Sequence, residues 1–237
     1  GLTRRGVLED INLTVMEGEI LGIAGLVGAG KTELARALYG LDKIDEGKVV
    51  IGGRPVRLQS PAEAIRMGVV LVPEDRKRLG LVLGMAVREN ISLASLFRFS
   101  RFGFVNGRRE RRTAGEMVES LRVKTPSLEQ QVRNLSGGNQ QKVVLAKWLL
   151  RGARVLIFDE PTRGIDVGAK AEVHGLIRAL ADKGAAILLI SSELQEVIDH
   201  SDRMVVMHGG KITGELRKEE ATPERVLFLA MGGDNRQ

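Results

Sequence analysis

The sequence has 237 residues, enough for one large domain or for a domain with an inserted lobe. It contains no cysteine, which excludes disulfides, a thiol nucleophile and a zinc–thiolate site. The net charge is +6, but aromatic residues make up only 3% of the chain, so we expect no nucleic-acid partner. No apolar run approaches the roughly 18 residues of a membrane span, and the first residues lack the apolar core of a signal peptide.

Two groups of arginines and lysines carry much of the positive charge. They lie at residues 76–78 and 108–112. We interpret both as solvated faces, and proximity to a membrane or to a membrane partner remains the alternative.

Apolar periodicity and turn residues predict strands that alternate with helices. In chain order we expect a strand over 11–15, a strand over 20–24, a helix over 31–39, a helix from the Ser60 cap to Gly68, a strand over 69–72, a strand over 155–158, a helix from the Asp166 cap to about 182, a strand over 185–190, a helix over 193–199 and a strand over 204–207. Such alternation favours a mostly parallel sheet in an α/β domain.

The stretch between residues 76 and 133 differs from the rest of the chain. Its alternating strand pattern disappears, and arginines, glutamates and short apolar groups occur at helical spacing. We therefore predict a mainly helical subdomain over 76–133, inserted into an α/β core made of residues 1–75 and 134–237.

A glycine-rich loop lies between the strand at 20–24 and the helix at 31–39. It matches the pattern G-x-x-x-x-G-K-[ST] and consists of Gly25, Leu26, Val27, Gly28, Ala29, Gly30, Lys31 and Thr32. In such a phosphate loop the backbone N–H groups and the helix N-terminus attract phosphate oxygens. Lys31 is expected to reach the β- and γ-phosphates of ATP, and the Thr32 hydroxyl to bind Mg²⁺.

Two acidic residues, Asp159 and Glu160, follow the apolar strand at 155–158. In a parallel sheet the carboxyl ends of the strands border the ligand crevice, so both carboxylates are expected to face the phosphate loop. Asp159 suits the Mg²⁺ shell, and Glu160 suits the polarisation of the water that attacks the γ-phosphate. A helix cap or a solvated turn is the alternative for this pair.

A second turn suited to anions precedes an apolar helix. The segment 135–142, which we call the signature segment, reads LSGGNQQK and offers Ser136, Gly137 and Gly138 at a helix start. One nucleotide does not need two phosphate cradles, so this turn is expected to close over ATP held by a partner. A simple capped helix is the alternative.

The order of these motifs resembles the nucleotide-binding domain of ABC transporters across essentially the whole chain. More narrowly, residues 74–82, the signature segment and the DEPTRGIDVGAK segment from Asp159 resemble the second ATPase half of ribose/galactose/xylose-type sugar importers. The resemblance implies an α/β fold, with a P-loop NTPase (RecA-like) core, a small antiparallel β part and an inserted helical subdomain. It also implies ATPase activity with ATP and Mg²⁺.

The resemblance further implies several partners. A second ATPase half, in the same full-length chain, would form a head-to-tail nucleotide sandwich in which Ser136, Gly137 and Gly138 contact the ATP of the other half and Asp166 lies at the interface. Transmembrane permease subunits would contact the helical insert, and a sugar-binding protein would act indirectly. The expected location is peripheral, on the cytoplasmic face of the bacterial inner membrane. The absence of an initial methionine fits a segment of a longer chain.

Three positions depart from the family pattern. The first residues contain no aromatic side chain to stack on adenine, and Arg4, Arg5 and Val7 are the candidates to replace it. Glu74 stands where most relatives have a glutamine that touches Mg²⁺ and the attacking water. Ser192 stands where most have a histidine that contacts the γ-phosphate, and a serine hydroxyl is shorter and never cationic. We expect Glu160, Lys31 and Ser192 to act in catalysis, and Thr32, Asp159 and Glu74 to hold the metal.

Alternatives to efficient sugar-import ATPase activity remain open. This half could bind ATP with weak or no turnover and complete the site of its partner. The solute could be a nucleoside or a furanosyl signal molecule instead of a monosaccharide. A DNA-repair or translation ATPase with the same head is disfavoured because the chain has no heptad run.

Overall fold

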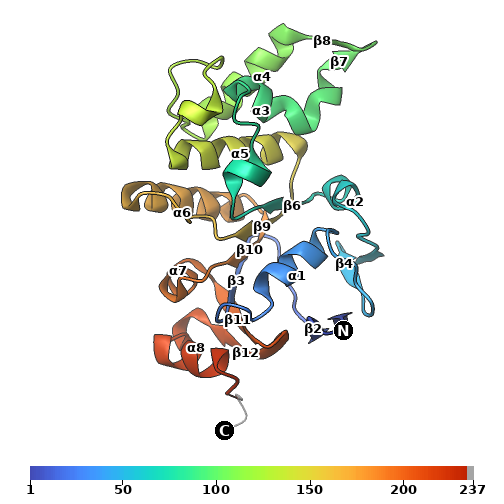
Figure 1. Ribbon diagram of the computed structural model, residues 1–237, viewed down its shortest axis with the longest axis vertical. Helices are drawn as coiled ribbons and strands as arrows, with labels where there is room; N and C mark the ends of the chain where they lie inside the picture. Colours follow the sequence, from blue (N-terminus) through green and yellow to red (C-terminus); the bar gives the residue numbers. More distant parts are fainter. Residues whose placement is uncertain (234–237) are drawn as a thin grey trace. The chain divides into compact units, whose positions relative to one another are not determined.

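Strands and helices alternate along the chain as the apolar periodicity predicts (Figure 1). The computed structural model describes residues 1–233. The strands are β1 (Leu2–Arg4), β2 (Leu8–Ile11), β3 (Ile20–Ala24), β4 (Val49–Ile51), β5 (Arg54–Val56), β6 (Val69–Val72), β7 (Ser100–Arg101), β8 (Phe104–Val105), β9 (Val155–Asp159), β10 (Ala186–Ile190), β11 (Arg203–His208) and β12 (Lys211–Arg217).

The helices are of three kinds. The α-helices are α1 (Lys31–Leu38), α2 (Pro61–Arg66), α3 (Val87–Ser92), α4 (Gly107–Ser120), α5 (Gly137–Arg151), α6 (Val167–Asp182), α7 (Leu194–His200) and α8 (Pro223–Ala230). A π-helix, η1, spans Arg76–Gly80, and the 3-10 helices are η2 (Leu93–Arg98), η3 (Val132–Asn134) and η4 (Lys218–Glu220).

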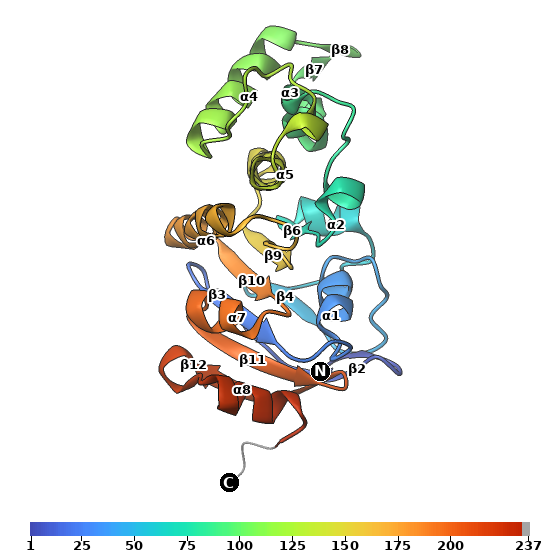
Figure 2. The same cartoon turned by 60° about the vertical axis from the view of Figure 1, so that its left-hand side comes forward.

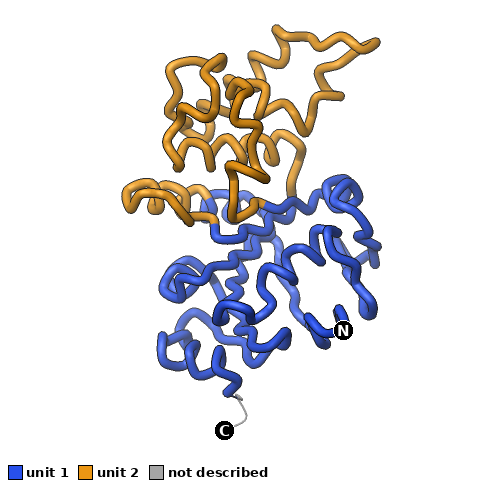
Figure 3. The backbone as a smooth tube through the Cα atoms, in the orientation of Figure 1, with its two compact units in different colours: residues 1–71, 154–160, 177–237 blue, residues 72–153, 161–176 orange. Residues whose placement is uncertain are grey.

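The chain divides into two compact units, coloured separately in Figure 3. The first unit contains residues 1–71, 154–160 and the chain from 177 onward, and the second contains residues 72–153 and 161–176. The second unit therefore includes α5 and the first part of α6 as well as the segment 76–133 that the sequence predicts as an insert.

A six-stranded sheet forms the centre of the first unit in the described part of the chain, with the order β12-β11-β3-β10-β9-β6. The pairs β11–β3, β3–β10 and β10–β9 are parallel, and β12 joins the edge antiparallel to β11. Strands β3, β9 and β10 consist mainly of buried apolar residues, as expected for a sheet covered on both faces. The α/β class and the mostly parallel sheet are thus confirmed.

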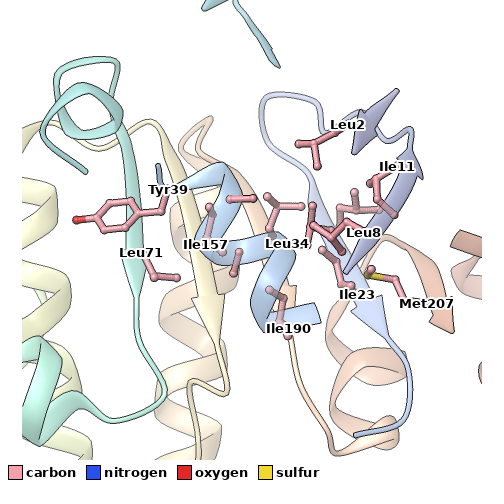
Figure 4. Close-up of a cluster of buried hydrophobic side chains, with 14 of the residues drawn as sticks. Leu2, Leu8, Ile11, Ile23, Leu34, Tyr39, Leu71, Ile157, Ile190 and Met207 are labelled. Atoms are coloured by element: carbon pink, nitrogen blue, oxygen red, sulfur yellow. The ribbon is translucent and has the colours of Figure 1, made fainter. Parts of the chain in front are cut away.

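The two faces of this sheet pack against different helices. Val205 and Met207 belong to a cluster that includes Leu34 of α1 and is shown in Figure 4. Their neighbours Met204 and Val206 belong to a second cluster, with residues of α7 and α8. This alternation follows from the two-residue period of a strand. Figure 2 shows α1 and α7 on opposite sides of the sheet.

Helix-start signals in the sequence act as predicted. The Ser60 hydroxyl accepts a hydrogen bond from the Glu63 backbone N–H at 3.3 Å, with Pro61 at the first helical position of α2. Asp166 caps α6, because its carboxylate accepts a hydrogen bond from the Ala169 N–H at 3.0 Å. Both helices therefore begin where the sequence places them.

The prediction of a strand over 11–15 is wrong. Strand β2 ends at Ile11, and the Asn12 side-chain amide donates back to the Asp10 carbonyl at 2.9 Å. Leu13 and Val15 still pack, half-buried, against the first cluster. Their apolar alternation reflects this packing and not a strand.

The second unit is mainly helical, with one short hairpin, β7–β8. Its helix α5 buries polar as well as apolar side chains. The Lys142 ammonium contacts Glu172 at 2.7 Å, and the Lys147 ammonium donates to the Gly80 carbonyl at 2.5 Å. Nearby, the buried Glu110 forms an ion pair with Arg88. Within residues 1–233, no helix is both long and apolar enough to cross a membrane.

Candidate functional site

The phosphate loop joins β3 to α1 in the first unit and depends on a glycine at its start. Gly25 has a φ of 150°, and a Cβ at this position would lie 2.5 Å from the Met207 carbonyl oxygen. Gly30 occupies the N-cap position of α1, so no side chain caps this helix. The free N–H groups of its first turn and the helix dipole together suit an anion.

Lys31, the first residue of α1, is folded back onto its own loop. Its ammonium donates to the carbonyl oxygens of Gly25 at 2.5 Å and Leu26 at 3.0 Å, and the residue is only 7% exposed. Burial lowers the pKa of Lys31, while the nearby Glu160 and Asp159 oppose this shift. The loop carbonyls therefore stabilise the buried Lys31 ammonium beside the loop in which a phosphate group would bind.

The first acid of the predicted pair, Asp159, ends strand β9 and is buried. The Thr32 hydroxyl donates to its carboxylate at 3.4 Å. Burial, and next the charge of Glu160, raise the pKa of Asp159 to about 6, while Thr32 and Lys31 act in the opposite direction. A cation placed here would relieve this crowding of negative charge.

The second acid, Glu160, has an unusual backbone conformation. Its φ is 51°, a left-handed value that is rare outside glycine, and its N–H donates to the Ile190 carbonyl at 2.9 Å. The Ser192 hydroxyl donates to the Glu160 carboxylate at 3.1 Å. Burial raises the pKa of Glu160, and the hydrogen bond from Ser192 opposes that rise. The parallel pair β9–β10 thus brings Glu160 and Ser192 together.

The donor set fits Mg²⁺. Thr32 and Asp159 offer two oxygens to one position, and Mg²⁺ commonly takes one or two protein oxygens and completes its shell with water and substrate phosphates. Residues 1–233 contain no group of three or more His, Cys, Asp or Glu side chains able to hold a metal by themselves. A metal bound here would therefore depend on a phosphate ligand.

The signature segment lies in the second unit and presents a different helix start. Ser136 occupies the N-cap position of α5, but its hydroxyl makes no capping bond and instead accepts from the Asn139 side chain at 2.9 Å. A Cβ on Gly138 would lie 2.8 Å from the Ala169 side chain. The first turn of α5 therefore keeps its free N–H groups, as an anion site requires.

Glu74 also lies in the second unit, where its carboxylate pairs with the Arg163 guanidinium. The metal contact predicted for Glu74, and the phosphate contacts predicted for Ser136, Gly137 and Gly138, remain predictions. Arg163 was not among the expected site residues. A cavity of about 400 Å³ is lined by Glu74, Asp75, Arg76, Lys77, Arg163 and Gly164.

The interpretation of residues 76–78 as a solvated face is wrong for Arg76. Lys77 and Arg78 are exposed, but Arg76 is 6% exposed and donates to the carbonyl oxygens of Arg163 at 2.8 Å and Gly164 at 3.0 Å. A run of three basic residues does not reveal which of them is buried, so its composition alone could not identify this contact.

Comparisons with known proteins agree with this geometry. Residues 8–163 match the family model described as ABC transporter. The ribose import ATP-binding protein RbsA 1 of Rubrobacter xylanophilus is 58% identical over 234 residues, which are 98% of this chain and 47% of that protein. A putative ribose/galactose/methyl galactoside import ATP-binding protein of Rhizobium etli is 52% identical over 232 residues, 98% of this chain and 44% of that protein. The chain thus spans less than half the length of these relatives.

Solved structures share the same fold. An ATP-binding cassette of an ABC transporter in its ADP conformation superimposes with a TM-score of 0.78 at 26% identity, over 95% of this chain and 92% of that one. A dimeric cassette bound to ADP and Pi, at 21% identity, gives a TM-score of 0.72 over 90% of each chain. With the phosphate loop, the two carboxylates and the signature segment in place, the chain belongs to the ABC transporter family.

Proposed function

We propose that this chain is the ATP-binding and ATP-hydrolysing half of an importer that takes up a monosaccharide through separate membrane subunits. The observation that carries the proposal is the arrangement of Lys31, Thr32, Asp159 and Glu160 around one helix start and one sheet edge. Relatives that are 58% and 52% identical bear the names of ribose and ribose/galactose import ATP-binding proteins, which supports a sugar as the solute.

In the proposed reaction each residue has one role. The N–H groups of the phosphate loop and the Lys31 ammonium bind the phosphates, and Lys31 exchanges its loop carbonyls for phosphate oxygens. Thr32 and Asp159 would hold Mg²⁺, which when bound supplies charge neutralisation at the phosphates. Glu160 orients the attacking water and accepts its proton, and the hydrogen bond from Ser192 holds the Glu160 carboxylate in place.

The signature segment supports a second ATPase half as partner. The first turn of α5 has no side-chain cap, whereas the Thr32–Asp159 pair that suits Mg²⁺ belongs to the first unit. We therefore propose that Ser136, Gly137 and Gly138 contact ATP held by the other half, with Asp166 at the interface.

A surface on the second unit supports a permease partner. A cavity of about 300 Å³ includes Leu93 and Leu96 of η2 and Val105 of the β7–β8 hairpin. The same hairpin exposes Phe102 and Phe104, which are 87% and 82% exposed. Exposed apolar groups of this size mark interaction surfaces. We propose that a permease segment covers them, which would place the chain on the cytoplasmic face of the bacterial inner membrane.

The test compares two substitutions in the complete importer in lipid vesicles. Lys31→Ala should lower steady-state ATP hydrolysis and uptake of radiolabelled ribose or galactose. Ser136→Arg should lower both further, because it blocks the opposite site. Unchanged turnover after Lys31→Ala would instead support the alternative, a half that binds ATP with weak turnover and completes the partner site. Uptake of a nucleoside or a furanosyl signal molecule in place of either sugar would support the other alternative.

A further inference from the structure

Arg76 begins the π-helix η1 and is the buried member of its basic run. Its two terminal nitrogens donate to consecutive carbonyl oxygens, of Arg163 at 2.8 Å and of Gly164 at 3.0 Å. A planar guanidinium can hold two acceptors in a fixed geometry, which an ammonium cannot. The backbone that leads to the α6 cap is therefore held by the side chain of a residue 87 positions earlier.

The hydrogen bonds of the Arg76 guanidinium go to backbone carbonyls and not to a carboxylate. Within residues 1–233 its Nε atom is buried and has no hydrogen-bond partner. Burial lowers the pKa of Arg76, with Asp75 opposing the shift. An apolar side chain would avoid the desolvation cost, so stability alone gives little reason for an arginine here.

The signature segment meets the same guanidinium. A Cβ on Gly137 would lie 2.6 Å from the Arg76 Nη2 atom and 3.2 Å from the Gly164 carbonyl oxygen. The absence of a side chain at Gly137 thus leaves room for Arg76. In return, the Arg163 side chain pairs with Glu74, two residues before Arg76. Three segments meet at this point: the residues after β6, the loop before α6 and the first turn of α5.

We propose that Arg76 is a positioning residue that holds the 163–166 loop and the first turn of α5 in one fixed arrangement. In terms of the proposed function, on which this inference rests, Arg76 presents Asp166 and the signature glycines together to the ATP of the partner half. Arg76 itself touches no nucleotide. Its loss should therefore slow turnover without weakening ATP binding at Lys31.

The test measures kcat and KM for ATP in the complete importer, together with thermal unfolding. Arg76→Met should lower kcat about tenfold with KM unchanged within about twofold, since small misplacements of reacting groups are costly. Arg76→Lys should recover only part of the rate, because an ammonium lacks the planar geometry in which the guanidinium donates to the two carbonyls from two separate nitrogens. The control Arg57→Met removes an exposed arginine of the first unit and should match the wild type.

Gly137→Ala disturbs the same contact by crowding Arg76 and leaves the charge of Arg76 unchanged. This variant should show the same fall in kcat, and it tests the proposal even if Arg76→Met fails to fold. A kcat that stays at the wild-type value in folded Arg76→Met or Gly137→Ala protein would overturn the proposal. The proposal would also be overturned if Arg76→Lys and Arg76→Met lost kcat equally and only in proportion to their loss of melting temperature. Absence of ATP hydrolysis in the wild type would refute the proposed function instead.

Discussion

The first turns of α1 and α5 are both free of side-chain caps, yet the two regions differ in what surrounds them. The turn of α1 has a cation, Lys31, held by carbonyls of its own loop, and the carboxylates of Asp159 and Glu160 are close to that cation. The turn of α5 has a guanidinium, Arg76, fixed by two backbone carbonyls. In the proposed function, the first region hydrolyses ATP and the second binds the phosphates of a nucleotide held by a partner.

The largest effect is expected at the proposed base. Glu160→Gln keeps the size of the side chain and its hydrogen bond to Ser192 but removes the proton acceptor, so ATP hydrolysis by the complete importer should fall about 10²-fold. ATP binding should remain. Initial rates of phosphate release measure the effect, with the exposed Glu17→Gln as control. A fall of twofold or less would show that turnover occurs mainly in the other half and would weaken the comparison.

The geometry of the phosphate loop gives the next prediction. Gly25→Ala would force a Cβ toward the Met207 carbonyl at 2.5 Å and strain a φ of 150°, so the loop should lose its shape. We expect ATP affinity to fall at least about tenfold and the free energy of unfolding to fall by about 1 to 3 kcal/mol. Calorimetric titration and urea unfolding measure the two. Gly84→Ala is the control, because its Cβ meets nothing within 4 Å; equal effects at both positions would contradict the account.

The buried Lys147 of the second unit should make the stability of the protein depend on pH. Burial lowers the pKa of Lys147 to about 8 from an ordinary 10.5. Between these values the unfolded chain binds the proton and the folded chain does not, so stability contributed by this group rises with pH. The rise is on the order of 3 kcal/mol at most. Lys147→Met should abolish it.

Urea unfolding of the wild type and of Lys147→Met at pH 7.5 and pH 10 checks this prediction, and the difference between the proteins removes the contribution of other groups. Identical pH dependence in both would show that Lys147 is not buried as described. ATP affinity at pH 7.5 should be the same in both, since Lys147 is not among the residues proposed to contact a nucleotide.

The smallest effect concerns two serines at helix starts. Ser60 caps α2, so Ser60→Ala should cost about 1 kcal/mol of unfolding free energy. Ser136 makes no cap on α5, so Ser136→Ala should cost almost nothing in stability but should lower turnover. Chemical unfolding and ATPase rates distinguish the two roles. A clear stability loss in Ser136→Ala would make it an ordinary cap.

The sequence predicts those features of the fold and the site whose residues are contiguous, and it misses those that depend on residues far apart in the chain. The phosphate loop and the acids after β9 come from contiguous motifs whose spacing fixes their place at a sheet edge. The edge strand β12 and helix α8 were not predicted, because the polar, Gly214-containing stretch of β12 shows little alternation. The buried state of Arg76 depends on carbonyls 87 and 88 positions later, a contact that no local pattern records.

The most direct test of the comparison is equilibrium binding of Mg-ATP to this 237-residue chain and to two variants. Lys31→Ala should raise the Kd at least about tenfold, whereas Ser136→Arg should bind ATP as the wild type does, because in the proposed function its turn contacts the nucleotide of the partner. Equal affinity of Lys31→Ala and the wild type, or loss of binding in a folded Ser136→Arg protein, would contradict the account.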